Sequence, residues 1–139
     1  MKTIDIKFDN RSYPINVGQG LIAYYELISQ HLPHKKIVII TNNLVADIYL
    51  DLLRDSLSPH KDVITIILPD GEKNKNTDSL NTIYSELLKN KADRNTTLIA
   101  LGGGVIGDLT GFAAATFMRG INFIPVSYTH LTLPTTPYV

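Results

Sequence analysis

The stretch Thr97-Leu-Ile-Ala-Leu-Gly-Gly-Gly-Val-Ile-Gly-Asp108 decides how this chain folds. The apolar run 98–101 is typical of a buried strand, and it stops abruptly at three glycines, 102–104. Two apolar residues and a further Gly-Asp pair follow, and a helix is predicted over 109–118. A strand, a glycine turn and a helix in this order bring free backbone N–H groups and the positive end of a helix dipole together, where phosphate binds readily.

Gly102, Gly104 and Gly107 also fit the G-x-G-x-x-G pattern of dinucleotide-binding folds. In the usual arrangement this loop follows the first strand, and an acidic residue about 20 positions later binds the ribose. Here the loop follows the third strand of the α/β part, and no Asp or Glu occurs after Asp108. Two interpretations stay open: a phosphate site in an unusual position, or a glycine turn that only lets strand and helix pack closely.

Length, charge and composition narrow the class of protein. The 139 residues are enough for one domain with a core, and 13 acidic residues balance 13 basic ones. We therefore expect a small-molecule ligand, with neither nucleic acid nor membrane as a partner. The absence of cysteine fits a reducing cytoplasm. No signal peptide and no apolar run of membrane-spanning length is present, so a cytoplasmic location is expected.

Hydrophobic periodicity predicts the remaining elements. Alternation over 3–17 predicts an antiparallel β-hairpin, and continuous β-branched runs predict buried parallel strands. In the second predicted helix, Val45, Ile48 and Leu52 are expected to face inward, and Thr77 is expected to cap the third. The predicted strands are 36–41, 63–68, 97–101 and 121–126, and the predicted helices before the glycine loop are 21–31, 43–57 and 77–88.

This order of elements predicts an α/β fold. We expect a Rossmann-like, mainly parallel sheet with helices on both faces, and the N-terminal hairpin antiparallel at one edge of the sheet. Ligands of such sheets bind beyond the carboxyl ends of the strands. Three polar loops, 41–43, 70–76 and 102–108, are predicted to lie there. The candidate site is therefore this edge of the sheet.

The last residues differ from the rest. Residues 126–139 contain no Asp, Glu, Lys or Arg, and neither strand nor helix periodicity holds over them. We expect an atypical tail that is extended or poorly ordered, and an artefactual origin stays open as an interpretation.

Two motifs carry a resemblance to a known family. The loop Pro69-Asp-Gly-Glu-Lys-Asn-Lys75 and the stretch from Gly102 to Ile121 together closely resemble the 3-dehydroquinate synthase family, over the chain up to about Ile124. The resemblance implies that residues 1–125 are the N-terminal NAD-binding domain. It also implies that the C-terminal metal and substrate domain is absent.

The activity implied by the resemblance is the NAD-dependent conversion of 3-deoxy-D-arabino-heptulosonate 7-phosphate to 3-dehydroquinate plus phosphate, a lyase step of the shikimate pathway. The family uses NAD and a divalent metal, zinc or cobalt, and works as a homodimer. The metal ligands have no counterpart in this chain, so the fragment is expected to be inactive alone. Two alternatives stay open: another sugar-phosphate cyclase, or a stand-alone nucleotide-binding module.

The resemblance also implies roles for single residues. It assigns Arg119 to the substrate phosphate, reached from the neighbouring subunit, and it gives this chain no catalytic residue. The residues that it assigns to NAD are Asn42, Asp70, Gly71, Glu72, Lys75, Gly103, Gly104, Val105, Gly107 and Asp108.

Plainer interpretations stand beside these roles. Glu72 and Lys75 fit a solvated loop, Asn42 fits a helix cap, Asp108 fits an acid in a first helical turn, and Arg119 fits a cation at a helix end.

His31 and His34 resemble a metal pair only superficially. Pro33 breaks the helix that would align them, and no third ligand lies near in the sequence. We expect surface histidines.

Overall fold

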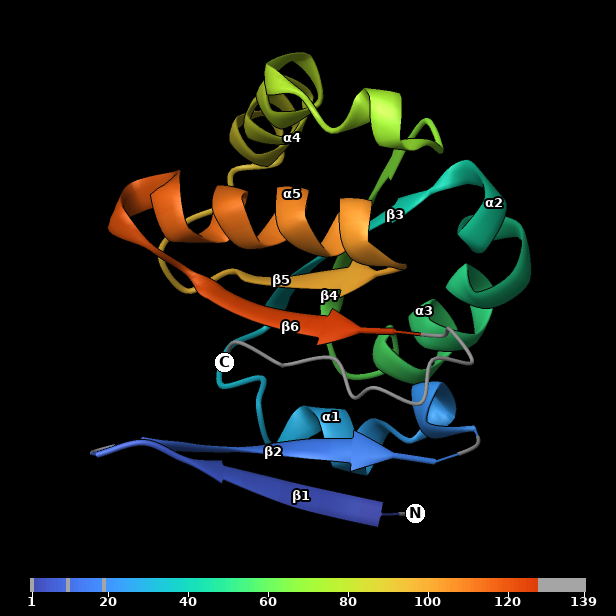
Figure 1. Cartoon of the computed structure of the whole chain (residues 1–139), viewed down its shortest axis with the longest axis vertical. Coiled ribbons are helices and arrows are strands. Elements are labelled where there is room, and N and C mark those ends of the chain that lie inside the picture. The colour runs from blue at the N-terminus through green and yellow to red at the C-terminus, as the bar shows by residue number, and fades with distance from the viewer. Residues whose placement is uncertain (1, 10, 19, 128–139) are drawn as a thin grey trace.

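The computed structural model describes residues 2–9, 11–18 and 20–127. Its centre is a four-stranded sheet in the order β4-β3-β5-β6 (Figure 1). The strands are β3 (Lys36–Asn42), β4 (Asp62–Leu68), β5 (Thr97–Leu101) and β6 (Asn122–Val126). All three pairings are parallel, which confirms the predicted parallel sheet.

The N-terminal hairpin forms as expected but not where expected. β1 (Lys2–Lys7) pairs antiparallel with β2 (Ser12–Val17), with Ile4 opposite Ile15. This pair is a separate two-stranded sheet, so its predicted position at an edge of the parallel sheet is wrong. The alternating pattern specifies which face of the hairpin is buried. It does not specify whether either strand of the hairpin also pairs with the parallel sheet.

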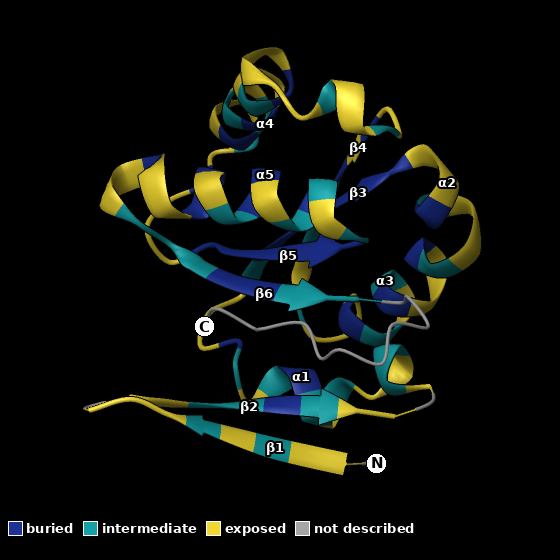
Figure 2. Ribbon diagram, in the orientation of Figure 1, coloured by how far each residue is buried: buried dark blue, intermediate teal, exposed yellow. Residues whose placement is uncertain are grey.

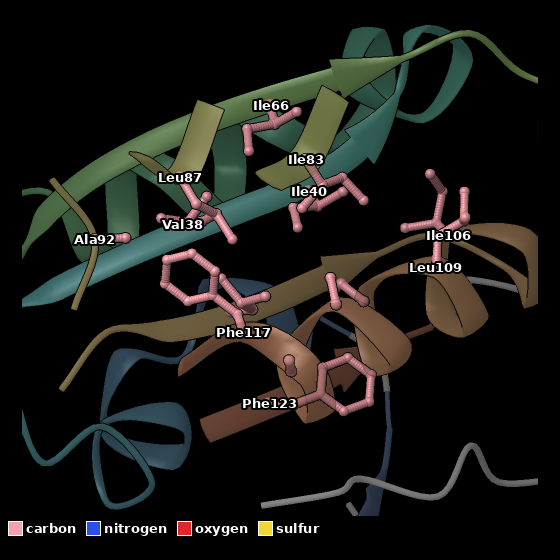
Figure 3. Packing of buried hydrophobic residues seen from close by; sticks show 14 of the residues in the cluster. Val38, Ile40, Ile66, Ile83, Leu87, Ala92, Ile106, Leu109, Phe117 and Phe123 are labelled. Atoms are coloured by element: carbon pink, nitrogen blue, oxygen red, sulfur yellow. The ribbon is translucent and has the colours of Figure 1, made fainter. Parts of the chain in front are cut away.

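Helices cover both faces of the parallel sheet, because side chains alternate along each strand. Val38 and Ile40 belong to the apolar cluster shared with α4 (Thr77–Lys89) and α5 (Gly104–Thr116), shown in Figure 3. Ile37 and Ile39 belong to the cluster on the other face. Figure 2 shows the central strands β3 and β5 almost wholly buried between these layers. The helices of the second face are η1 (Leu21–Ala23), α1 (Tyr25–Ser29), α2 (Asn43–Val45), η2 (Ala46–Leu50) and α3 (Asp51–Leu57).

The helical segment after β3 departs from its predicted periodicity. Val45 is buried as expected, but Ile48 and Leu52 are 62% and 53% exposed. Leu50 and Leu53 take the buried face instead. The cause is the π-helical turn η2, whose wider turn shifts every later side chain around the helix axis.

Two other helix limits correct the predicted ones. α4 is capped by Asn76, whose side chain accepts from the Ser79 N–H, and Thr77 is its first helical residue. α5 begins at Gly104 rather than at residue 109, so the second Gly-Asp pair lies within the helix. It ends at Thr116, and the short turn η4 (Phe117–Arg119) follows.

Val126 belongs to the sheet and not to an atypical tail. It is the last residue of β6, lies opposite Leu101, and its carbonyl accepts a hydrogen bond from the Gly102 N–H at 3.1 Å. Residues 128–139 of the expected tail lie outside the described residues. Within the described ranges, no helix has both the length and the apolar character that crossing a membrane requires.

Candidate functional site

The three predicted loops meet at one edge of the sheet, because β3, β4 and β5 run parallel. Asn42 lies opposite Leu68, and Thr41 lies opposite Leu101. The buried Thr41 hydroxyl donates to the Leu101 carbonyl at 2.7 Å. This bond fixes the end of β5 against the end of β3, so the glycine loop begins from a rigid point.

The helices that begin at this edge differ in how their first turns are capped. The Asn42 side chain accepts from the Val45 N–H at 2.8 Å, and the Asn76 side chain accepts from the Ser79 N–H at 2.9 Å. α5 instead begins after Gly103, with no side-chain hydrogen bond at its cap. Its first amides are therefore left for a partner other than a capping side chain.

The glycines of the loop divide into two kinds. A Cβ at Gly102 would lie 3.1 Å from Cβ of Ile106, so close packing of strand and helix requires glycine there. A Cβ at Gly103, Gly104 or Gly107 would meet no heavy atom of the described residues within 4 Å, chain neighbours and local helix backbone aside. Packing within the described chain therefore explains Gly102, but it does not explain the other three. Their bare backbone, the cradle, borders open space that a side chain would occupy.

Charged side chains stand beside this cradle. The Lys75 ammonium lies 2.6 Å from a carboxylate oxygen of Asp108 and 3.9 Å from one of Glu72. The pKa of Lys75 is raised, first because its ammonium donates to Asp108 and then because that carboxylate attracts it. Since Asp108 directly follows Gly107, the pair joins the 70–76 loop to the first turns of α5. A carboxylate here can accept from sugar hydroxyls, and an ammonium attracts phosphate.

The 70–76 loop is held by side chains that are not among the site residues assigned from the two sequence motifs. Asn43 accepts from the Asp70 N–H at 2.9 Å, and Asn74 donates to the Asp70 carbonyl at 2.8 Å. Gly71 has a φ of 118°, a backbone conformation that favours glycine, so the turn itself explains this residue. The repeated Asn residues after β3 and β4 were the available signal, because Asn readily bonds to nearby backbone.

Two of the predicted site residues sit apart from these contacts. Val105 is partly buried in the first turn of α5. Arg119 is exposed beyond the other end of that helix, whose 13 residues span about 20 Å. The structure therefore does not bring Arg119 to the glycine cradle. Its φ of 67° follows a φ of 47° at Met118, and such strained backbone is concentrated at functional positions.

The three histidines among the described residues, His31, His34 and His60, form no cluster with acidic residues. Within residues 2–9, 11–18 and 20–127, no group of three or more His, Cys, Asp or Glu side chains is placed to hold a metal ion. His31 is half-buried, and burial lowers its pKa, whereas His34 is exposed. His60 stacks on Tyr25 with ring centroids 4.1 Å apart.

A parallel sheet covered on both faces, with a bare glycine turn at its carboxyl edge, defines a Rossmann-like α/β domain. The family model described as 3-dehydroquinate synthase N-terminal matches residues 65–134. The chain belongs to the 3-dehydroquinate synthase family.

Curated relatives agree with this assignment. The 3-dehydroquinate synthase of Nitrosomonas europaea is 50% identical over 129 residues, which are 92% of this chain and 35% of the relative. That of Ruthia magnifica is 48% identical over 131 residues, 94% of this chain and 36% of the relative. The chain thus spans about a third of the length of these relatives.

Solved structures share the fold. A 2-deoxy-scyllo-inosose synthase complexed with carbaglucose-6-phosphate, NAD+ and Co2+ has a TM-score of 0.83 at 23% identity, over 92% of this chain and 35% of its own. A 2-epi-5-epi-valiolone synthase from Streptomyces hygroscopicus with NAD+ and Zn2+ bound has a TM-score of 0.71 at 23% identity, over 89% of this chain and 34% of its own.

Proposed function

We propose that this chain is the NAD-binding part of a 3-dehydroquinate synthase. The observation that carries the proposal is the cradle of Gly103, Gly104 and Gly107 at the uncapped start of α5. A pyrophosphate there would accept from the backbone amides of the first turn and approach the backbone without meeting a Cβ. The solved relatives that contain NAD+ share this fold, which supports the choice of a dinucleotide.

The surrounding residues fit the other parts of NAD. We assign Glu72 to ribose hydroxyls, Asp108 to the nicotinamide ribose, and Lys75 to the same loop as a cation facing the ligand. The Val105 amide lies in the first turn of α5 and joins the pyrophosphate contacts. Bound NAD would supply a hydride acceptor, and this chain's own residues would bind and orient it.

The whole reaction needs more than these residues. We propose the conversion of 3-deoxy-D-arabino-heptulosonate 7-phosphate to 3-dehydroquinate plus phosphate, a lyase step of the shikimate pathway, carried out in the cytoplasm by a homodimer. Arg119 would reach the substrate phosphate of the neighbouring subunit, which fits its distance from the cradle in its own subunit. A divalent metal, zinc or cobalt, would be held by residues outside this chain, so we propose that the 139-residue chain alone does not turn over.

Sequence identity to the relatives favours this reaction over that of another sugar-phosphate cyclase. The relatives at 48–50% identity are named 3-dehydroquinate synthases, whereas the two cyclases with other products are 23% identical. A stand-alone nucleotide-binding module would share the cradle, and only the activity of the longer protein separates it from the enzyme.

Calorimetric titration of the purified chain with NAD tests the site. Gly104→Val should abolish binding, because the branched side chain fills the cradle. Glu72→Ala should weaken binding by about 1–3 kcal/mol, the contribution of a charged hydrogen bond. Ala115→Val and Glu26→Ala, at exposed positions elsewhere, are the matched controls. Unchanged affinity in both site variants would reject the proposal.

A further inference from the structure

We propose that Asn42, Asn43 and Asp70 form a clamp that positions Glu72 and Lys75 at the nucleotide site. The inference rests on the proposed function for the identity of the ligand. It gives a positioning role to Asn43, which the resemblance did not assign to the site. It also gives a positioning role to Asn42 and Asp70.

Asp70 is held through its side chain and through its backbone. Its carboxylate accepts from the Asn42 side-chain amide at 3.1 Å, and its N–H donates to the Asn43 side chain at 2.9 Å. Its carbonyl accepts from Asn74 at 2.8 Å. Asn42, the last residue of β3, and Asn43, the first residue of α2, thereby fix Asp70, which lies just beyond the end of β4.

Asn42 is engaged at both ends of its amide. It is 7% exposed, and its side-chain oxygen caps α2 through the Val45 N–H while its NH₂ donates to Asp70. Both polar atoms of this buried side chain are therefore hydrogen-bonded within the protein, which favours a positioning role. The side chains of Glu72 and Lys75, in contrast, are exposed.

Fixing Asp70 restricts the residues that follow. Gly71 turns the chain at a φ of 118°, and a single 3₁₀ turn, Glu72–Asn74, comes next. The Lys75 N–H closes this turn on the Glu72 carbonyl at 3.0 Å. With so short a tether, Glu72 and Lys75 are presented beside the cradle before a ligand arrives, which lowers the ordering cost of binding.

Reversing the donor and the acceptor of the hydrogen bond between Asn42 and Asp70 tests the clamp. Asn42→Asp keeps the helix cap but replaces the donor to Asp70 with a second carboxylate. Adding Asp70→Asn restores the bond in the opposite direction. Asn43→Ala removes the acceptor for the Asp70 N–H at an exposed position, so the fold is retained, and Asn43→Asp keeps an acceptor there. Asn81→Asp, an exposed substitution in α4, controls for the added charge.

Two measurements are made on the 139-residue chain: hydrogen exchange of the Asp70, Asn74 and Lys75 amides without ligand, and NAD affinity by calorimetry. Asn42→Asp and Asn43→Ala should each speed exchange and weaken NAD binding by about tenfold, the value of one hydrogen bond. The double variant and Asn43→Asp should recover both properties to within about threefold. A direct contact between the Asp70 carboxylate and the nucleotide would not be restored by reversing the polarity.

Two results would overturn the clamp. One is unchanged amide exchange in Asn42→Asp and Asn43→Ala. The other is loss of NAD binding in Asp70→Asn without recovery in the double variant, which would make Asp70 a direct contact. Absence of NAD binding by the wild-type chain would contradict the proposed function instead, and the exchange rates would still decide the clamp.

Discussion

Helices α4 and α5 begin at the same edge of the sheet, yet their first turns are built in opposite ways. At α4, the Asn76 side chain caps the Ser79 N–H and also donates to the Lys73 carbonyl. At α5, the cap residue is Gly103, which has no side chain to offer. The first helix start is completed by its own residues, whereas the second is left open for a partner.

The glycines at the start of α5 show the same contrast. Gly102 lies against Ile106, but Gly103 and Gly107 face open space. A sequence pattern treats these positions alike, because it records only that the side chain is missing. The structure separates a glycine that packing needs from glycines that leave room, and substitutions should separate them in the same way.

The largest effect is expected at the packed glycine. In Gly102→Ala the new Cβ would lie 3.1 Å from Cβ of Ile106, which is attached to the backbone of α5, so the helix itself must shift. We expect a loss of about 1–3 kcal/mol in the free energy of unfolding, measured with urea. Gly103→Ala is the matched control and should change stability by less than about 0.5 kcal/mol. Equal losses in both variants would contradict the division.

Removing the cap of α4 should cost less stability than Gly102→Ala. Asn76→Ala removes a cap and should destabilise the chain by about 1 kcal/mol. Thr77→Ala, one residue later and already inside α4, should leave stability nearly unchanged. Urea unfolding of the two variants distinguishes the observed cap from the one that the sequence predicted, and the reverse order would favour Thr77.

A substitution at Gly107, where a Cβ would meet open space, should have opposite effects on stability and on NAD binding. Gly107→Ala lies inside α5 with free space at its Cβ, so the ligand-free chain should gain about 0.5–1 kcal/mol in the free energy of unfolding. NAD affinity should fall, because the methyl group enters the cradle. Thermal unfolding and calorimetry on one sample check both signs. A gain in stability with unchanged NAD affinity would contradict the proposal that the cradle binds the pyrophosphate of NAD.

The sequence predicted the parallel strands well because their signal is local. The β-branched run of β3 and the apolar run ending at Gly102 can only be buried strands, and the structure confirms both. Ile48 was misplaced because a π-turn changes the helical period without a recognisable residue pattern. The position of the hairpin was missed because hairpin residues specify only their own pairing.

The site was predictable as a location but not as a set of contacts. Parallel strands had to bring the three loops to one edge, so Glu72 and Asp108 could be placed together in advance. The bridge that Lys75 makes to Asp108 depends on how the 70–76 loop is held. That loop is held by Asn43 and Asn74, whose exposed amides look like ordinary turn residues in a sequence.

The smallest effect is expected from the bridge between the two loops. Lys75 and Asp108 have side chains that are 41% and 61% exposed, and exposed ion pairs contribute little to stability. The pKa of Lys75 is nevertheless raised, because Asp108 accepts a hydrogen bond from its ammonium. A base with a raised pKa stabilises the folded state while it is protonated, so the contribution is complete below the unfolded value near 10.4 and is lost as pH rises through the folded pKa.

The stability difference between wild type and Lys75→Gln should therefore be small and constant from about pH 6 to 9 and should disappear as the pH rises through the raised pKa of Lys75. Urea unfolding across this range measures it, with Lys73→Gln, on the same loop, as the control. Added salt should reduce the difference at neutral pH, because exposed charges are screened. A difference that persists unchanged to the highest pH would mean that Lys75 stabilises the fold through its aliphatic chain and not through Asp108.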